Sequence, residues 1–437
     1  MTNQAFSSNE LYDAWPVLSL EDKLAGFKLL PAEERERFFR QLSARDEAKL
    51  LEAFPPRERR FWIRLLAPED AADLIQETAP DKREEIVSLI DEPLKSEIKG
   101  LLAYAEDQAG GLMSPRYARL RPNMTVNEAF SYLRRDARDR EKTFYYAFVV
   151  DPQERLLGVV SFRDLFSARG DQSIRSVMRT DIITARDNMD QEALSDLFAR
   201  HNLMMIPIVD AEMHIKGIVT HDDIIDVLRE EATEDIQKIG GTEALDAPYL
   251  QIPLTQMIKK RAGWLAALFI GEMLTATAMG YYEDQISRAV VLALFVPLII
   301  SSGGNSGSQA STLVIRAMAL KEIRLSDWWR VVRREFSTGI ALGCILAAIG
   351  LVRILAWQGL FHSYGEHYML IALTVAFSLI GVVLWGTLAG SVLPIVLRLL
   401  GFDPASASAP FVATLVDVTG LIIYFTVATL ILTGSLL

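Results

Sequence analysis

The sequence predicts a multidomain membrane protein, in which an all-α superhelical N domain precedes an α/β segment, a connecting helix and a five-helix transmembrane domain. Three observations support this prediction. Short amphipathic helical patterns repeat over about the first 105 residues, a strand–turn–strand–helix pattern occurs twice between residues 144 and 224, and five long apolar stretches follow residue 260.

Charge divides the chain into two parts. The first 258 residues contain 47 acidic and 33 basic residues, a net charge of −14, whereas the remainder is apolar and slightly basic. An acidic balance argues against nucleic acid as a partner, because binding to phosphates requires Lys and Arg. The same balance permits cation binding by the soluble half.

Several other classes of function are not expected. Cys344 is the only cysteine, so the sequence offers neither a disulfide nor a cysteine-based zinc site. Five histidines and one cysteine provide no pairing of nucleophile and base, and no phosphate-binding loop is visible, so an enzyme is not predicted. The N-terminus lacks the pattern of a signal peptide, which predicts a cytoplasmic location for the soluble half.

Residues 10–105 read as a series of short helices. An acidic opening followed by a Leu/Phe stripe recurs every 16–20 residues or so, which is typical of a helical superhelix. Proline is common at the first turn of a helix, so the prolines of this region mark helix starts. These are Pro31, Pro55, Pro68 and Pro80.

A second repeat follows. The stretch "FYYAFVVDPQERLLGVVSFRDL", which begins at Phe144, matches "NLMMIPIVDAEMHIKGIVTHDDI", which begins at Asn202. Helical patterns precede both copies. The repeat resembles the cystathionine-β-synthase (CBS) domain pair. Equivalent residues 59 positions apart are Asp151 and Asp210, Gly158 and Gly217, and Ser161 and Thr220.

CBS pairs often bind adenine nucleotides, and a Ser/Thr-x-x-Asp element at the end of the second strand contacts the ribose. The resemblance therefore implies ATP as a ligand. The same four-residue pattern is also a helix capping box, so a purely structural role is the alternative. The residues concerned are Ser161 and Asp164 in the first copy, and Thr220 and Asp223 in the second.

The stretch "DDIIDVLREEATEDIQKIGG" crowds seven acids into one helical segment. Like charges three and four residues apart repel each other on a helix. A solvated acidic helix is one interpretation. Divalent-cation binding is favoured, because the stretch leads into a connecting helix before the membrane. The acids are Asp222, Asp223, Asp226, Glu230, Glu231, Glu234 and Asp235.

Five apolar stretches are long enough to cross a bilayer, which takes about 20 residues. Basic residues before the first stretch and between the second and third place the N-terminus inside. A simple anchor would need only one span, so five spans favour transport. The predicted spans are Ala262–Tyr282, Ala289–Leu320, Phe336–Trp357, Tyr368–Leu400 and Pro410–Leu436.

The second span has a polar centre, "PLIISSGGNSGSQASTLVIRAMA", which begins at Pro297. Proline is expected to kink this helix, and glycines to expose backbone carbonyls to a permeating ion. Asn305, Ser308 and Gln309 add side-chain oxygens. The alternative is a small-residue contact between helices.

Asp417 lies in the last span, within the apolar stretch "PFVATLVDVTGLIIYF". A carboxylate at the centre of a membrane helix costs about 2.5–3.5 kcal/mol on insertion scales, so it needs a partner or a purpose. A proton, or Arg316 of another helix, would serve. A cation is the more economical partner, and two-fold symmetry would set two such aspartates around one axis.

Four separated motifs resemble the MgtE family of magnesium channels, and the similarity covers nearly the whole chain. They are the glycine-rich segment from Pro297 to Thr312, "YAEDQAGGLM", "EATEDIQKIG" and "ATLVDVTGL". The resemblance implies an N domain over residues 1–112, CBS domains over 113–175 and 176–235, a connecting (plug) helix over 236–260 and a transmembrane domain over 261–437.

The resemblance implies a homodimeric, Mg²⁺-selective channel of the inner (plasma) membrane, in contact with membrane lipid and gated closed by cytoplasmic Mg²⁺. Asp417 matches the pore aspartate, with Ala413, Asn305 and Gln309 along the same path. In the N domain the sensor acids are not matched residue by residue, and Asp70 and Asp73 are considered there without being assigned. The implied sensor ligands are Asp190, Glu192, Asp223, Asp226, Glu231, Glu234, Asp235 and Asp403.

Two departures from the family pattern are Asn202 and Ala409, at positions where the family can carry Asp and Asn. Two other functions stay open. A coupled divalent-cation carrier would use the intramembrane acids Asp417 and Glu272. A membrane-anchored CBS nucleotide sensor would bind nucleotide without transporting an ion.

Overall fold

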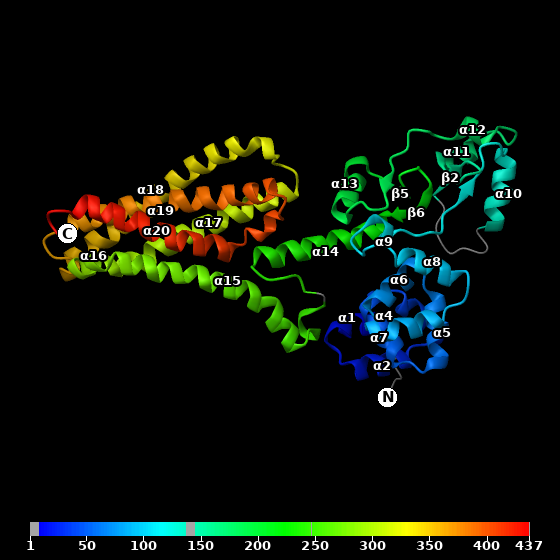
Figure 1. Cartoon of the computed structure of the whole chain (residues 1–437), viewed down its shortest axis with the longest axis horizontal. Helices are drawn as coiled ribbons and strands as arrows, with labels where there is room; N and C mark the ends of the chain where they lie inside the picture. Colours follow the sequence, from blue (N-terminus) through cyan, green and yellow to red (C-terminus); the bar gives the residue numbers. More distant parts are fainter. Residues whose placement is uncertain (1–7, 137–144, 246, 437) are drawn as a thin grey trace. The chain divides into compact units, whose positions relative to one another are not determined.

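The computed structural model describes residues 8–136, 145–245 and 247–436 (Figure 1). The chain divides into two compact units, Met1–Glu231 and Ala232–Leu437. The first contains short helices and two small sheets, and the second contains the long apolar helices.

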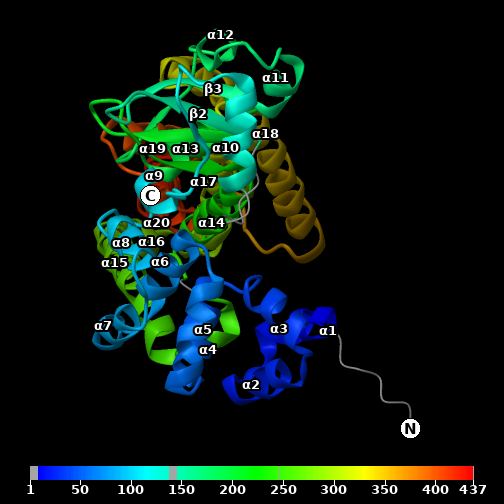
Figure 2. The same cartoon turned by 90° about the vertical axis from the view of Figure 1, so that its right-hand side faces the viewer.

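The N domain is all-α, as predicted, and its short helices follow one another closely (Figure 2). Each predicted proline lies at a helix start: Pro31 and Pro55 immediately precede helices, whereas Pro68 and Pro80 are first residues. The helices are α1 (Ser8–Ala14), α2 (Leu20–Leu29), α3 (Ala32–Phe39), α4 (Ala44–Ala53), α5 (Pro56–Leu65), α6 (Pro68–Glu77), α7 (Pro80–Ser88) and α8 (Leu94–Leu101), with a 3₁₀ turn at Trp15–Val17.

An aromatic core holds these short helices together. The Phe27 and Trp62 rings meet edge to face, with centroids 5.2 Å apart, and Phe39 and Phe54 pack on the same group. This core continues into the second CBS domain, where Ile206 and neighbouring strand residues join it. The N domain and that CBS domain therefore share one hydrophobic core in this structure.

The predicted CBS pair contains two three-stranded sheets of identical topology. In each sheet a short first strand pairs parallel with the second, and the second pairs antiparallel with the third. The elements are α9 (Ala109–Leu112), β1 (Arg119–Leu120), α10 (Val126–Asp136), β2 (Tyr146–Val150), β3 (Leu156–Ser161), α11 (Phe162–Ser167), α12 (Ile174–Val177), β4 (Ala185–Arg186), α13 (Gln191–His201), β5 (Met205–Val209) and β6 (Ile215–Thr220).

The repeated residues of the sequence are structural in both copies. Asp151 and Asp210 each accept two backbone N–H groups through one carboxylate oxygen and so close the turn between the paired strands. A Cβ on Gly217 would lie 2.6 Å from the Ser114 carbonyl oxygen, so only glycine lets the crossing chain approach. Phe144, the first residue of the repeat, lies outside the described residues.

The predicted connecting helix over residues 236–260 is wrong as one continuous helix. Helix α14 (His221–Ile239) contains the acidic stretch and ends at a Gly-Gly pair, and α15 (Leu254–Tyr281) begins after Pro253. Gly241 has a φ of +75°, which favours glycine and terminates α14. Apart from a 3₁₀ turn at Tyr249–Gln251, the described residues between the two helices form neither helix nor strand.

The second unit contains five helical segments that are long and apolar enough to cross a membrane, in agreement with the predicted number. They are Leu254–Tyr281, Val290–Ala319, Leu325–Phe361, Tyr368–Leu399 and Ala409–Leu432. Their main helices are α15, α17 (Val296–Ala319), α18 (Trp328–Phe361), α19 (Tyr368–Leu399) and α20 (Ala409–Leu432), with α16 (Glu283–Arg288) and 3₁₀ segments at Val290–Phe295, Leu325–Asp327 and Pro404–Ser406 between them.

The expected kink at Pro297 is wrong, because this residue lies in the first turn of α17, where a missing N–H is tolerated. The glycines that follow are helical and serve close packing against α19. A Cβ on Gly386 would lie 2.3 Å from the Gly303 carbonyl oxygen, and one on Gly390 would lie 2.1 Å from that of Gly307. Small residues thus let the α17 and α19 backbones touch.

Candidate functional site

Asp417 lies within α20 and faces the glycine-rich part of α17. A Cβ on Gly304 would lie 3.5 Å from the Cβ of Ala413 and 3.8 Å from Asp417 Oδ1. Ala413 and Asp417 are one helical turn apart, so both side chains lie on the same face of α20, opposite Gly304 of α17. The absent side chain at Gly304 leaves room beside the carboxylate.

A second carboxyl group approaches Asp417 from α15. Gly271 packs against α20, since a Cβ at this position would lie 3.0 Å from Thr414 Cγ2. The next residue, Glu272, comes within hydrogen-bonding reach of Asp417. Two carboxylates in contact repel each other unless a proton or a cation lies between them. This pair is therefore suited to holding a positive charge.

Most other polar side chains of α17 bond within the helical bundle. Ser306 pairs with Thr387 at 2.7 Å, Ser308 donates to the Ala409 carbonyl oxygen, and Ser311 donates to that of Ala407. Asn305 and Gln309 are exposed instead, one helical turn apart. The structure places these two amides on one face of α17 but shows no contact between them and Asp417.

A separate group of acids lines a cavity of about 640 Å³ in the first unit. Helix α4 contributes Glu47, α6 contributes Asp70 and Asp73, and α14 contributes Asp226. Two lining residues, Arg40 and Arg229, are basic. Helices from the N domain and from the CBS pair thus bring their carboxylates to one place, here named the acid cavity.

Burial and mutual repulsion make the acid cavity unfavourable for negative charge. Glu47 is only 3% exposed, and desolvation, followed by repulsion from Asp70 and Asp73, raises its pKa from 4.5 to about 9. Desolvation raises the pKa of Asp73 from 3.8 to about 7, with Asp70 as the leading charge. Desolvation also raises the pKa of Glu230 on α14, with further contributions from Asp226 and Glu231.

A divalent cation would relieve this repulsion. Hard cations such as Mg²⁺ bind carboxylate oxygens, and Mg²⁺ usually keeps several of its waters. A cavity of 640 Å³ lined by carboxylates from three helices has room for hydrated ions. Binding such an ion would also hold α14 against α4 and α6, because its ligands come from all three.

Three of the remaining sensor acids predicted from the CBS segments have structural partners. Asp190 caps α13 by accepting the Glu192 N–H at 2.9 Å, and Glu231 accepts a hydrogen bond from Gln191 at 2.6 Å. Asp223 accepts hydrogen bonds from the Thr220 N–H and hydroxyl. Glu192 lies in the first turn of α13, and Asp235 lies on α14, nine residues beyond Asp226.

Glu234 and Asp403 are brought together, but around a lysine. Lys238 donates a hydrogen bond to Asp403 at 2.8 Å and also pairs with Glu234. Of the two departures from the family pattern, Asn202 has a φ of +50° and ends α13. Ala409 is the first residue of α20.

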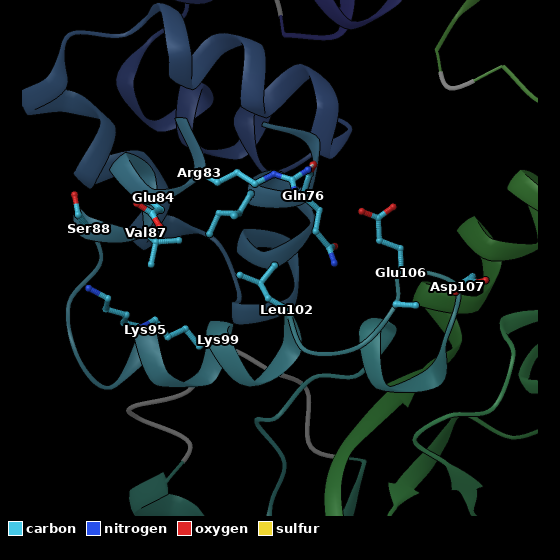
Figure 3. Close-up of a pocket in the computed structure, with 12 residues that line it drawn as sticks. Gln76, Arg83, Glu84, Val87, Ser88, Lys95, Lys99, Leu102, Glu106 and Asp107 are labelled. Atoms are coloured by element: carbon cyan, nitrogen blue, oxygen red, sulfur yellow. Dashed lines mark hydrogen bonds between the residues drawn. The ribbon is translucent and has the colours of Figure 1, made fainter. Parts of the chain in front are cut away.

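A larger cavity, of about 980 Å³, lies between α6, α7 and α8 (Figure 3). Lys95 and Lys99 lie along one wall, whereas Glu106 and Asp107 lie at the far end. The Arg83 guanidinium group donates hydrogen bonds to the carbonyl oxygens of Gln76 and Thr78 at the end of α6. Mixed charges make this cavity a poorer cation site than the acid cavity.

Sequence reasoning named Asp70, Asp73, Asp226 and Glu230 among its candidate acids but missed Glu47. The available signal was its helix, since Glu47 lies beside Ala48 and one turn before Leu51, both of which are buried. An acid on the apolar face of an amphipathic helix is rare without a partner. The charge of Glu106 contributes to the raised pKa values of Asp73 and Glu230, but the sequence around Glu106 shows no signal of this kind.

The chain resembles proteins of known family along most of its length. A family model described as MgtE, divalent cation transporter, matches residues 296–427. The MgtE intracellular N domain matches residues 7–107, and CBS domains match 109–171 and 174–230.

Two curated relatives and one solved structure illustrate the similarity. Magnesium transporter MgtE of Thermus thermophilus is 40% identical, over 80% of this chain and 75% of that protein. Its Enterococcus faecalis namesake is 33% identical, over 76% and 71%. A solved cytosolic domain, described as that of the Mg²⁺ channel MgtE in complex with ATP, is 35% identical with a TM-score of 0.47, over 50% of this chain and 90% of that one.

The acid cavity predicts that stability falls as pH rises when divalent ions are absent. Glu47 and Asp73 hold protons more tightly in the folded chain, so folding binds protons between pH values of about 4 and 9. In EDTA, we expect the melting temperature of the detergent-solubilised chain to drop by several degrees across this window. Millimolar Mg²⁺ should reduce the drop.

Substitution Glu47→Gln should remove much of this pH dependence, because a neutral amide needs no proton. The exposed Glu33 offers a control, since Glu33→Gln should leave the profile unchanged. A wild-type melting temperature that rises from pH 5 to pH 9 in EDTA would contradict the prediction.

Proposed function

The chain belongs to the MgtE family of magnesium transporters, and from this membership we propose that it is a homodimeric Mg²⁺ channel of the inner membrane. Its N-terminus lies in the cytoplasm, and cytoplasmic Mg²⁺ bound at the acid cavity closes the ion path. The single observation that carries the proposal is Asp417, a carboxylate on a membrane helix that lies, with Ala413 of the same helix, opposite Gly304.

Asp417 is proposed to hold a hydrated Mg²⁺ ion in the permeation path. Magnesium loses its water reluctantly, so a conducting site must leave space for the hydration shell. The absent side chain at Gly304 and the small one at Ala413 provide that space. In a homodimer the second subunit would add an equal carboxylate, and the exposed amides of Asn305 and Gln309 could hydrogen-bond the ion's waters.

The acid cavity is proposed as the cytoplasmic sensor. Without a divalent ion, its carboxylates repel one another, which favours separation of α4 and α6 from α14. Bound Mg²⁺ replaces this repulsion with shared coordination and favours the compact arrangement. The ion must bind the compact state more tightly to shift the equilibrium, and a hundredfold preference corresponds to about 2.7 kcal/mol.

A coupled carrier is the second candidate function. The observation that favours it is the contact between Glu272 and Asp417, since two adjacent carboxyls could exchange one cation for another. Flux measurements separate the two functions. A channel gives Mg²⁺ flux that follows only the electrochemical gradient of Mg²⁺, whereas a carrier gives flux that also depends on a second ion.

ATP is proposed as a ligand of the CBS pair, at the paired Ser161 and Thr220 positions. In the structure these residues cap helices: the Ser161 hydroxyl accepts the Asp164 N–H, and the Thr220 hydroxyl donates to Asp223. Asp164 also pairs with Arg179 at 3.4 Å. Helix capping accounts for these contacts, so binding must be measured directly.

Substitution Asp417→Ala should abolish most transport without preventing insertion. We expect Mg²⁺ uptake into proteoliposomes to fall by about tenfold or more, because the hydrated ion loses its carboxylate ligand. Thr426→Ala is the matched control, since this side chain on α20 bonds only to its own helix in the described contacts. Wild-type uptake by Asp417→Ala would contradict the assignment.

Neutralising the acid cavity should weaken closure. The double variant Asp73→Asn/Asp226→Asn removes two charges that Mg²⁺ would bridge, so about tenfold more cytoplasmic Mg²⁺ should be needed for half-closure, equivalent to about 1.4 kcal/mol. Patch recordings over a range of Mg²⁺ concentrations measure this shift. Asp171→Asn, on an exposed loop, is the control, and an unshifted double variant would argue against the sensor.

Calorimetric titration of the full chain in detergent should detect ATP, with weaker binding for Asp164→Asn. Asp181→Asn, an exposed position outside both pairs, is the control. A folded wild-type protein that releases or absorbs no heat at millimolar ATP would exclude the nucleotide.

A further inference from the structure

The C-terminal end of α14 carries an ion triad formed entirely by the protein. Lys238 donates a hydrogen bond to Asp403 Oδ2 at 2.8 Å and pairs with Glu234, one helical turn earlier. Each of these side chains is about one-third exposed.

Both partners of Lys238 are held in place. The other oxygen of Asp403, Oδ1, accepts the Ala405 N–H at 2.8 Å and caps the short helix at Pro404–Ser406. Glu234 lies four residues before Lys238 on the same helix, a spacing at which opposite charges meet. The ammonium therefore joins α14 to a loop carboxylate that is already fixed.

The end of α14 also has a defined backbone cap and makes an apolar contact with the loop. The Thr242 N–H bonds to the Gln237 carbonyl oxygen and the Gly241 N–H to that of Lys238, which is a Schellman cap. Ile239 packs against a buried cluster that contains Ala405 and Ala407. The helix end thus has a defined position on the loop 403–408.

The loop 403–408 leads directly into α20. Ser408 caps this helix by accepting the Phe411 N–H, and the same hydroxyl accepts a hydrogen bond from Trp264 of α15 at 3.2 Å. Asp417 lies on α20, nine residues after this cap. Any displacement of the loop therefore acts on the start of the helix that carries the intramembrane carboxylate.

We propose that Lys238 is a fixed cation that locks the end of α14 onto the loop 403–408, so that Glu234 and Asp403 hold this ammonium in place of a divalent ion. Two carboxylates that converge on one point are able to hold a divalent ion. Here the chain supplies the charge itself. The lock therefore persists in the absence of Mg²⁺, and it does not depend on whether Mg²⁺ closes the ion path.

Hydrogen–deuterium exchange of the full chain in detergent tests this lock. In EDTA, Lys238→Met should increase exchange in residues 237–242 and 403–408 by about tenfold, because local opening becomes easier when the two carboxylates lose their cation. Lys238→Arg should exchange like wild type. Millimolar Mg²⁺ should restore protection in Lys238→Met, since the two carboxylates are then free to bind it.

Two further variants make the result decisive. Asp403→Asn should open the same segments, and Mg²⁺ should not rescue the double variant Lys238→Met/Asp403→Asn, which keeps only one carboxylate. Lys82→Met is the control, since it removes an N-domain ion pair of 2.6 Å with Glu52 and should leave both segments unchanged.

Two outcomes would overturn the proposal. One is wild-type exchange in EDTA for both Lys238→Met and Asp403→Asn. The other is protection of residues 403–408 by Mg²⁺ in wild type as strong as in Lys238→Met, which would mean that an ion holds the joint. If cytoplasmic Mg²⁺ does not reduce uptake by the wild-type chain, while the variants show the exchange expected above, the proposed sensor is wrong and the lock is unaffected.

Discussion

A carboxylate taken out of water is unstable unless a positive charge lies beside it, and the chain meets this constraint in three ways. Glu47 and Asp73 lie in a cavity where neighbouring carboxylates repel them, and a cation or protons can relieve this repulsion. Asp417 meets a second carboxyl beside the glycines of α17. At Asp403 the positive charge is a lysine of the chain itself. We propose that the positive charges at the first two places are exchangeable, whereas the third belongs to the chain itself.

The membrane helices must also place Asp417 accurately, which depends on backbone contact between α17 and α19. Side chains larger than hydrogen at Gly386 or Gly390 would collide with the carbonyl oxygens of α17. Such contact leaves little freedom for α17 to move relative to α19. By contrast, α15 is bound to α20 through fewer such contacts, with Gly271 against Thr414 as the closest glycine approach. The position of Glu272 is thus set by a less constrained helix.

Local patterns made much of the fold predictable. Prolines mark the N-domain helix starts, the 59-residue repeat defines the CBS pair, and apolar length identifies the five spans. Two expectations were wrong. The kink at Pro297 ignored the position of this residue, which lies in the first turn of a helix. The connecting helix over residues 236–260 was implied by the resemblance, whereas Gly241 ends α14 before it. The burial of Glu47 and the pairing of Lys238 with Asp403 depend on segments distant in the chain, which periodicity does not reveal.

Helix α14 connects the acid cavity with the fixed lysine. Asp226 lines the cavity near the start of the helix, and Lys238 lies twelve residues later, near its end. We propose a different kind of positive charge for each of these positions: an exchangeable ion at the acid cavity, and the ammonium group of the chain itself at Lys238. The ammonium group does not depend on Mg²⁺, so removal of the ion would leave the contact between Lys238 and Asp403 in place.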